Sequence, residues 1–448
     1  MGGRLWTDIW APCVPGCCGT LEMRNMMNRR KTGIIGGGAS GLMAAVAAAD
    51  NRKGAGDEVV ILEKKERVGK KILVTGNGKC NLTNLSFSME KIGEYYHGAP
   101  EERLRSIFSR FSPEDTLKLF YRMGMLTTSR EGYVYPLSGQ ASTVLDALRF
   151  ELERLQVSIL TECRIVGIKP RGKDGYLVRT EDGNLHFDRL ILACGSPAGQ
   201  KAGEGMDGYA YAEALGHRVI RPQPALTALR CEGDFWKSLA GVRCGASVSL
   251  SISGEEDCYR EEGELQLTDY GISGIPVFQL SRHASCALAR GRKVQARIDF
   301  LPSLSGSRKD YEKMTEQRIS ACLGRSMEVL FCGLVNKKII LTLLKRNGLR
   351  PQDTVEERNR EEIRRVFSDL RDFPVRVKSV NPFGSAQVCA GGVPLSEVTD
   401  RMESVKHPGL YFAGELLNVD GRCGGYNLQW AWSSGYVAGL HAAGQSAT

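Results

Sequence analysis

The sequence predicts an α/β protein built on a parallel sheet, with an insertion that is first β-rich and then helical. Near the start, an apolar strand, a glycine-rich turn and an alanine-rich helix follow one another over residues 31–49. A second buried strand, 409–413, lies close to the other end. Between them, alternating apolar residues over 223–302 give way to helical periodicity over 307–370. We therefore expect a disordered tail (1–30), the first part of the α/β domain (31–222), a β-rich insert (223–302), a helical insert (303–372) and the second part of the domain (373–448).

The glycine-rich turn has the spacing of a dinucleotide-binding fingerprint. Gly36, Gly38 and Gly41 follow the strand 33–35 and open the helix 42–49. The first glycine permits a sharp turn, the second lets backbone amides approach a pyrophosphate, and the third allows close packing of helix and strand. We expect the phosphate charge to lie at the helix N-terminus, where unpaired amides and the helix dipole favour an anion.

A second strand strengthens this interpretation of a motif that is weak on its own. The strand 58–62 ends at Glu63, about twenty residues beyond the glycines. A carboxylate at this place can accept hydrogen bonds from both hydroxyls of an adenosine ribose. The alternative is that Glu63 is a solvated side chain at a strand end with no ligand.

A polar loop follows Glu63 and contains many hydrogen-bond donors. Glycines flank Asn77, and Lys70, Thr75 and Asn81 lie near in the sequence. Such a loop suits phosphate and ring contacts, although a plain surface turn is the alternative.

The intervening segments predict ordinary α/β elements. We expect amphipathic helices over 100–123, a hairpin at 133–136, a helix over 142–155 and two strands over 157–168. A hairpin should join 176–180 to 184–187 through Asp182 and Gly183, and 190–193 should be a buried strand.

Residues 203–208, GEGMDG, also match the glycine pattern and precede a helix at 209–215. The preceding strand ends about ten residues too early, and no second strand with a terminal acid follows. We therefore expect no separate NAD(P)H domain. Within the β-rich insert, residues 267–276 predict a loop of unusual conformation between strands at 246–252 and 294–300.

Composition indicates a globular protein without membrane spans or metal sites. The net charge of +9 would suit an anionic partner, but acids and bases alternate over 308–371, which favours a solvated helical surface over nucleic-acid binding. No apolar run approaches the ~18 residues of a membrane span. The 14 cysteines form no CxxC pair, as expected of reduced thiols in a cytoplasmic protein and unlike a flavoprotein disulfide reductase.

The C-terminal region has the features that a flavin requires besides the nucleotide turn. Glu415 follows a buried strand, and Gly425, Tyr426 and Asn427 begin a small-residue helix. An acid at this place can hold a ribityl hydroxyl, and helix amides can stabilise negative charge on a reduced ring.

At this point the chain resembles the BaiN/YhiN-like family of FAD-dependent flavoproteins. The matching blocks cover most of the chain after residue 31 and are IIGGGASGL, EKKERVGKKILVTGNGKCNLTN, GEGMDGYAYAEALGH, TDYGISGIP, AGGVPLSEV and HPGLYFAGELLNVDGRCGGYNLQWAWSSGYVAG. Asp269 departs from the family, in which many members carry His after the Thr.

The resemblance implies a split Rossmann-like FAD-binding domain with an inserted β-barrel-like and helical region. It also implies reduction of C=C bonds in 3-oxo-Δ4,6 bile-acid or other steroid intermediates, with NAD(P)H as co-substrate. The cofactor-binding residues it implies are Gly36, Gly38, Ala39, Ser40, Gly41, Glu63, Lys64, Lys70, Thr75, Gly76, Asn77, Gly78, Asn81, Ile165, Ala193, Gly195, Gly414, Glu415, Gly425, Tyr426 and Asn427.

The corresponding reaction is hydride transfer to an enone, with a donor polarising the 3-oxo group and an acid completing the reduction. Tyr270, Arg422 and Tyr426 are candidate catalytic residues because they lie in the matching blocks, with a structural role as the alternative for each. Two other functions stay open: a flavoprotein that reduces another unsaturated small molecule, and an RNA-associated flavoprotein. The latter is the less favoured, since no basic stretch is interleaved with aromatic residues.

Overall fold

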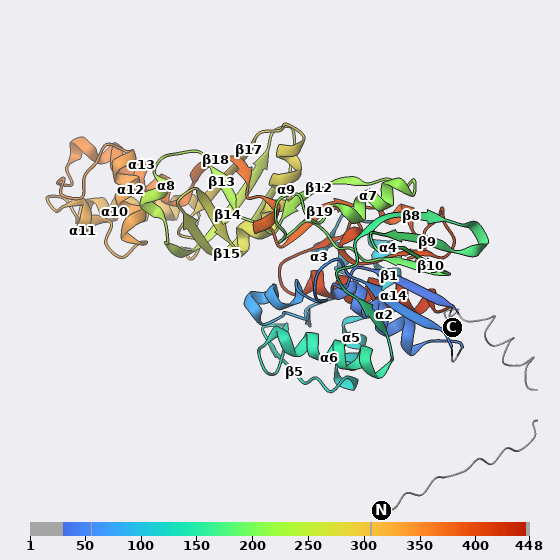
Figure 1. Ribbon diagram of the computed structural model, residues 1–448. Helices are drawn as coiled ribbons and strands as arrows, with labels where there is room; N and C mark the ends of the chain where they lie inside the picture. Colours follow the sequence, from blue (N-terminus) through green and yellow to red (C-terminus); the bar gives the residue numbers. More distant parts are fainter. Residues whose placement is uncertain (1–29, 55, 305–306, 445–448) are drawn as a thin grey trace, which may run out of the picture.

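The computed structural model describes residues 30–54, 56–304 and 307–444. The tail expected over 1–30 therefore lies, apart from Arg30, outside the described residues. Figure 1 shows three regions in a row: the α/β domain, a β-barrel beside it, and a group of helices at the far end of the barrel. No helix among the described residues combines the length and apolar character that crossing a bilayer requires.

A five-stranded parallel sheet organises the α/β domain and confirms the predicted fold class. Its order is β20-β11-β1-β2-β7, and all four pairings are parallel. The first four strands are almost fully buried because they consist of short apolar runs. Their bounds are Lys31–Ile35 (β1), Glu58–Leu62 (β2), Ser158–Leu160 (β7), Arg189–Leu192 (β11) and Leu410–Phe412 (β20). Since β20 comes from the far end of the sequence, the domain is split as expected.

Two small-residue helices pack together in this domain. Helix α2 (Ala39–Asp50) follows the glycine turn, and α14 (Tyr426–Ala442) comes near the end of the chain. A Cβ on Gly435 would lie 2.4 Å from the carbonyl oxygen of Ser40, and one on Gly439 would lie 2.1 Å from that of Ala44. The two backbones therefore approach so closely that only glycine fits at these two positions.

The remaining elements of the domain follow the sequence predictions closely. The expected hairpin joins β9 (Tyr176–Thr180) to β10 (Asn184–Phe187), and the residues expected to be helical over 100–123 form two helices. The other elements are α3 (Ile92–Tyr95), β4 (Tyr96–His97), α4 (Glu101–Phe108), α5 (Pro113–Arg122), β5 (Thr127–Arg130), β6 (Tyr133–Pro136), α6 (Ala141–Arg154), β8 (Ile165–Pro170), α7 (Asp207–Ala214), β21 (Asp420–Gly421) and the short β3 (Thr83–Asn84).

The insert forms a closed six-stranded barrel, in the order β13-β16-β15-β14-β17-β18. Its strands are Leu229–Cys231 (β13), Arg243–Ile252 (β14), Cys258–Thr268 (β15), Gly271–Gly274 (β16), Val294–Asp299 (β17) and Phe373–Val380 (β18). The short helix α8 (Trp236–Leu239) follows β13, and four helices lie between β17 and β18: α10 (Arg308–Ala321), α11 (Met327–Leu330), α12 (Lys337–Arg346) and α13 (Arg360–Arg371). Closure of the barrel therefore uses a strand beyond residue 372, where we expected the insert to end. The two-stranded sheet of β12 (Ile220–Ala225) and β19 (Val388–Gly392) links barrel and domain.

Two expectations within the insert are wrong. The 15-residue helix α9 (Ile275–Ala289) lies inside the region expected to be antiparallel β. Proline in its first turn is compatible with a helix start, and its buried residues Val277, Leu280, Ser281 and Ala284 recur at helical spacing. The segment 267–276 is not a loop either: it contains the end of β15, a tight reversal, and all of β16.

The contact between α2 and α14 gives a stability prediction. We expect Gly439→Ala to destabilise the protein by about 1–3 kcal/mol, because the added methyl group would overlap the Ala44 carbonyl and push the helices apart. Thermal unfolding followed by circular dichroism would measure the lowered melting temperature. The control is Gly245→Ala, where an added Cβ meets nothing within 4 Å. Equal melting temperatures for the two variants would contradict the prediction.

Candidate functional site

The glycine turn between β1 and α2 is closed on one side and open on the other. Gly36 has φ +105, and a Cβ there would lie 2.5 Å from the carbonyl oxygen of Ala193. A Cβ on Gly41 would lie 1.9 Å from the oxygen of Gly36, whereas one on Gly38 would meet nothing within 4 Å. The first and third glycines are thus required by packing. The second leaves free space in front of the first turn of α2, which begins with Ala39, Ser40 and Gly41.

Glu63 is fixed beside this turn at the end of β2. Its Oε2 accepts a hydrogen bond from the backbone N–H of Gly37 at 2.8 Å, and its Oε1 accepts one from Lys65 N–H at 2.8 Å. Each oxygen of a carboxylate can accept more than one hydrogen bond. The arrangement therefore keeps acceptor positions for the two hydroxyls of a ribose.

The second glycine motif is joined by ion pairs to the two lysines that follow Glu63. Lys64 Nζ pairs with Asp207 at 2.5 Å, and Lys65 Nζ pairs with Glu204 at 2.7 Å. Both acids belong to the GEGMDG segment. Lys64 thus makes an exposed ion pair here, and its expected contact with ribose stays a prediction.

Three further expected residues lie around the same end of the sheet. Cys163 N–H donates to the carbonyl oxygen of Glu63 at 3.0 Å, which places the start of β8 and Ile165 beside β2. The oxygen of Ile165 accepts from Tyr211 Oη at 2.8 Å. Ala193 packs under the turn, and Gly195 has φ +70 with open space where a Cβ would stand.

The polar loop after Glu63 is a 3₁₀ segment with a sharp reversal. Gly76 and Asn77 both have φ near +55, and Gly78 has φ +82. Thr75 Oγ1 donates to the oxygen of Ile72 at 2.6 Å, and Lys70 makes an ion pair with Glu66 at 2.6 Å. The backbone of the reversal is exposed, and contacts of these residues with a ligand stay a prediction.

Asn81 ties this loop to the C-terminal block. With its amide oriented to satisfy its neighbours, its nitrogen donates to Thr83 O at 3.0 Å and its oxygen accepts from Gly425 N–H at 3.2 Å. Gly425 has φ +94, and a Cβ there would lie 2.6 Å from Thr83 O. Since Gly425 is the N-cap of α14, the loop and the helix start form one structural unit.

The side chains of Tyr426 and Asn427 hold the C-terminal block together. Asn427 exchanges two hydrogen bonds of 2.8 Å with the backbone of Gly421. Tyr426 stacks on Tyr95 with ring centroids 4.8 Å apart, and burial raises the pKa of Tyr426 to about 12. Tyr426 therefore stays protonated at neutral pH.

Glu415 lies in the same block as Gly414. Its Oε2 pairs with Lys71 Nζ at 2.6 Å, and its Oε1 accepts from Cys389 N–H at 3.0 Å. Gly414 donates its N–H to Ser434 Oγ at 2.9 Å. A Cβ on Gly414 would lie 2.3 Å from Ser40 Oγ, so this block meets the first turn of α2.

The remaining two catalytic candidates lie in different surroundings. Tyr270 belongs to the barrel: its hydroxyl accepts from Asn381 Nδ2 at 2.9 Å, and Arg230 lies over its ring. Arg422 lies in the C-terminal block and donates to Glu261 on β15 at 2.8 Å. Asn427, an expected cofactor residue, donates from Nδ2 to the carbonyl oxygen of Arg422 at 3.2 Å, whereas the side-chain contacts of Tyr270 are with Asn381 and Arg230.

Several polar residues that we did not single out meet between the barrel and the C-terminal block. We call them, together with Arg422, the junction cluster: His97, Glu261, Arg282, His283, Asp420 and Arg422. Asp420 accepts a hydrogen bond from Arg282 Nε at 2.7 Å, and His97 contacts His283 edge to face at 5.7 Å. For Asp420 the sequence did offer a signal, because this residue stands in the block DGRCGGYN. For His97 and Arg282 the sequence offered no signal of a functional role, because their partners are distant in sequence.

Burial controls the protonation of this cluster. It lowers the pKa of His97 to about 3 and that of His283 to about 4, with the charge of Arg282 acting in the same direction. Burial raises the pKa of the Asp420 carboxyl. Both imidazoles are consequently neutral at physiological pH.

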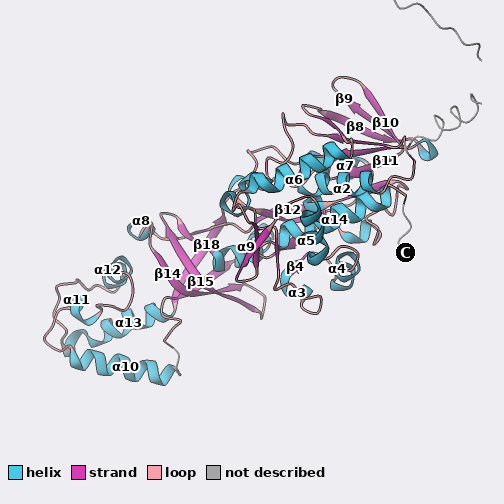
Figure 2. Ribbon diagram, turned by 90° about the horizontal axis from the view of Figure 1, so that it is seen from below, coloured by secondary structure: helices cyan, strands magenta, loops and turns pink. Residues whose placement is uncertain are grey.

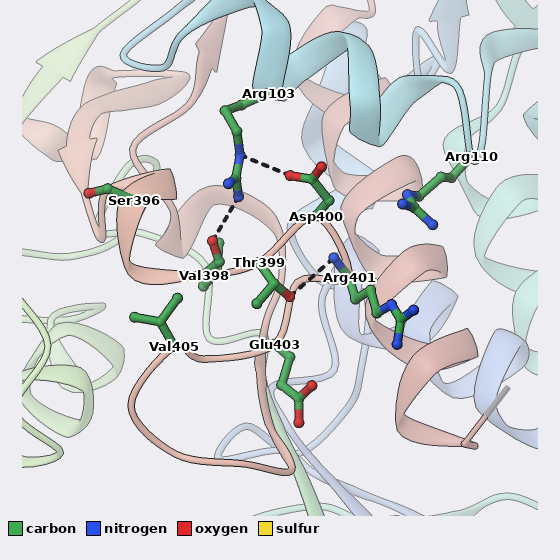
Figure 3. Close-up of a pocket in the computed structure, with 9 residues that line it drawn as sticks. All are labelled: Arg103, Arg110, Ser396, Val398, Thr399, Asp400, Arg401, Glu403 and Val405. Carbon is green, nitrogen blue, oxygen red and sulfur yellow. Dashed lines mark hydrogen bonds and ion pairs between the residues drawn. The ribbon is translucent and has the colours of Figure 1, made fainter. Parts of the chain in front are cut away.

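A shallow cavity of about 570 Å³ lies elsewhere, between α4 with the residues that follow it and the segment 396–405 (Figure 3). Arg103 is held there by Asp400 at 3.0 Å and by the oxygen of Val398 at 2.7 Å. None of the expected site residues lines this cavity, whose lining is Arg103, Arg110, Ser396, Val398, Thr399, Asp400, Arg401, Glu403 and Val405. We therefore do not assign it to the cofactor.

Comparison with known proteins identifies the family of the chain. The family described as "HI0933-like protein Rossmann domain" matches residues 30–441. A 3-dehydro-bile acid delta(4,6)-reductase of Clostridium scindens is 41% identical over 86% of this chain and 93% of that protein. A ribosomal RNA dihydrouridine synthase of Escherichia coli K12 is 27% identical over 86% of this chain and 91% of that protein.

Among solved structures, a 3-ketosteroid delta1-dehydrogenase from Sterolibacterium denitrificans has a similar fold. The TM-score is 0.51 at 14% identity, over 93% of this chain and 99% of that one. This likeness concerns the fold alone and agrees with the split Rossmann-like domain.

The position of Glu63 gives a prediction for cofactor binding. We expect Glu63→Gln to weaken FAD binding about tenfold or more, since hydrogen bonds to a charged group contribute roughly 1.5–3 kcal/mol. Calorimetric titration of the apoprotein with FAD measures the change in affinity. Glu58→Gln is the matched control, because Glu58 lies at the exposed start of the same strand and pairs with Lys31. Equal affinities for the two variants would remove Glu63 from the site.

Proposed function

Because this chain belongs to the HI0933-like Rossmann family, we propose that it is an FAD-dependent oxidoreductase that reduces C=C bonds of 3-oxo-Δ4,6 bile-acid intermediates. NAD(P)H is the proposed electron source. The observation that carries the proposal is the extensive identity with the C. scindens reductase, which spans both halves of the split domain and the barrel.

The geometry supports FAD as the cofactor. The open side of the turn at Gly38 suits a pyrophosphate, and Glu63 offers acceptors for a ribose. Gly425 is the N-cap of α14 and offers no capping side chain, so the first amides of the helix can stabilise negative charge on a ligand. Bound FAD would supply hydride to the substrate, and the protein would orient both partners.

The electron source and the cellular location are further parts of the proposal. The GEGMDG segment is engaged by Lys64 and Lys65, so the nicotinamide would react at the flavin without a second Rossmann domain. The described cysteines are all free thiols, which supports a cytoplasmic location.

A second candidate is reduction of uridine in RNA, favoured by the relative named as a ribosomal RNA dihydrouridine synthase. Uracil and a 3-oxo-4-ene share a C=C bond conjugated to a carbonyl group. In both, hydride adds at the far carbon of the conjugated system and the carbonyl oxygen gains negative charge. The same site could therefore serve either substrate, and the expectation that no nucleic acid binds stays a prediction.

Anaerobic stopped-flow spectroscopy distinguishes these substrates. The FAD-loaded protein is reduced with one equivalent of NADH or NADPH and then mixed with a 3-oxo-4,6-diene bile acid. We expect rapid return of the oxidised flavin spectrum, because the conjugated diene accepts hydride. The saturated 3-oxo bile acid is the control and should leave the flavin reduced.

The same mixing experiment with unmodified ribosomal RNA tests the second candidate. If RNA reoxidises the flavin and the diene does not, reduction of uridine in RNA replaces reduction of bile acids as the proposed function. Reoxidation by neither would overturn the proposed reaction class.

A further inference from the structure

The barrel touches the C-terminal block through polar contacts of the junction cluster. Arg282 on α9 donates to Asp420, and Arg422 donates to Glu261 on β15. In addition, Cys423 N–H donates to Gln279 Oε1 on α9 at 3.1 Å. Figures 1 and 2 both show α9 on the side of the barrel that faces the α/β domain. These contacts lie within five residues of Gly425, where α14 begins.

Arg282 uses only one edge of its guanidinium group. Its Nε binds Asp420 Oδ2 at 2.7 Å, and its Nη groups make no hydrogen bond with any residue that the structure describes. Asp420 is 2% exposed, and its Oδ1 has no partner among the described residues. Arginine and carboxylate commonly pair through two parallel hydrogen bonds. The single bond here anchors the guanidinium and leaves its outer edge available.

Arg422 is arranged in the same way from the opposite side. Its Nη2 binds Glu261 at 2.8 Å, and within the described chain its side chain makes no second hydrogen bond. Asp420, which anchors Arg282, stands two residues before Arg422, so both guanidinium groups are anchored at the same short segment of the C-terminal block. His283 is held by stacking on Tyr259, with ring centroids 3.7 Å apart. The neutral imidazoles add no positive charge of their own.

We propose that Arg282 and Arg422 together form the donor set that receives the substrate's carbonyl oxygen, with Asp420 and Glu261 as positioning residues. The inference rests on the proposed function. As hydride from the reduced flavin adds to the far carbon of the conjugated C=C bond, the π electrons move toward the carbonyl and produce an enolate oxygen. A proton from water then adds to the carbon next to the one that received the hydride while the carbonyl group re-forms, so that the substrate gains one hydride and one proton in total. Anchored guanidinium donors stabilise the charge that develops on that oxygen.

A phenol provides a test that does not depend on turnover. Phenolate resembles an enolate, and 4-nitrophenol reports its own ionisation by absorbance. With the oxidised, FAD-loaded full-length protein, difference spectra as a function of pH give the pKa and the Kd of the bound phenol. We expect the wild-type protein to lower the phenol's pKa by about one unit or more, since one unit corresponds to a tenfold preference for the anion.

Substitutions of the two arginines locate the donors. We expect Arg282→Gln and Arg422→Gln each to weaken phenolate binding about tenfold and to return the phenol's pKa toward its free value. Asp420→Asn should give a smaller effect in the same direction, because the guanidinium stays but loses its anchor. Arg297→Gln is the matched control: it removes another arginine–aspartate pair of the barrel, Arg297–Asp372, away from the cluster. FAD content and melting temperature identify any variant that fails to fold. If Arg282→Gln fails to fold, Arg282→Lys is measured in its place, because lysine keeps the positive charge.

Each result decides the proposal. An unchanged pKa of the bound phenol in Arg282→Gln and Arg422→Gln, or no shift in the wild-type protein, would reduce these pairs to contacts between barrel and domain. If the arginine-dependent shift is found while the diene bile acid fails to reoxidise the flavin, the donor set stands and the proposed substrate is wrong. If the diene reacts equally well in all variants, the substrate stands and the donor set is wrong.

Discussion

Close backbone contacts join the glycine turn to the end of β11 and α2 to α14, and the way the two ends of the chain meet depends on them. Neither Gly41 nor Gly435 could carry a side chain without overlapping a carbonyl oxygen of the neighbouring backbone. Interiors are packed too densely to absorb such an overlap without moving whole elements. These contacts therefore fix residues from both ends of the sequence against each other. They hold the first turn of α2, next to the glycine turn, against the middle of α14.

The attachment of the barrel to the α/β domain determines which of its residues meet the C-terminal block. The chain leaves the domain through β12 and returns through β19, and these two strands pair with each other. The barrel is thereby attached at one end, with α9 facing the C-terminal block. Residues of α9 and β15 reach the segment that precedes Gly425, while the helices α10–α13 stay at the far end of the barrel (Figure 1). In the proposed function, the insert would therefore act through the side chains of α9 and β15 that meet this segment.

Local patterns made much of the fold predictable. The strand 58–62 and the hairpin 176–187 follow from short apolar runs and a turn at Asp182 and Gly183, which act over a few residues. Helix α9 was missed because small and polar residues, among them Ser281 and Ser285, occupy its buried face and obscure the apolar period. The junction cluster was missed for another reason. Arg282 and Asp420 are 138 residues apart, and no local rule pairs them.

Two arginine–carboxylate pairs of this chain differ in the donors that they leave without an acceptor. Arg364 binds Glu316 with both Nε and Nη2, at 2.6 and 3.1 Å, and so satisfies both partners on the exposed helical surface. Arg282 makes one bond to a fully buried acid and is itself only 20% exposed. Removing such a group from water is costly unless its remaining donors find acceptors. An oxygen that acquires negative charge during the reaction is the acceptor for which that unused edge is suited.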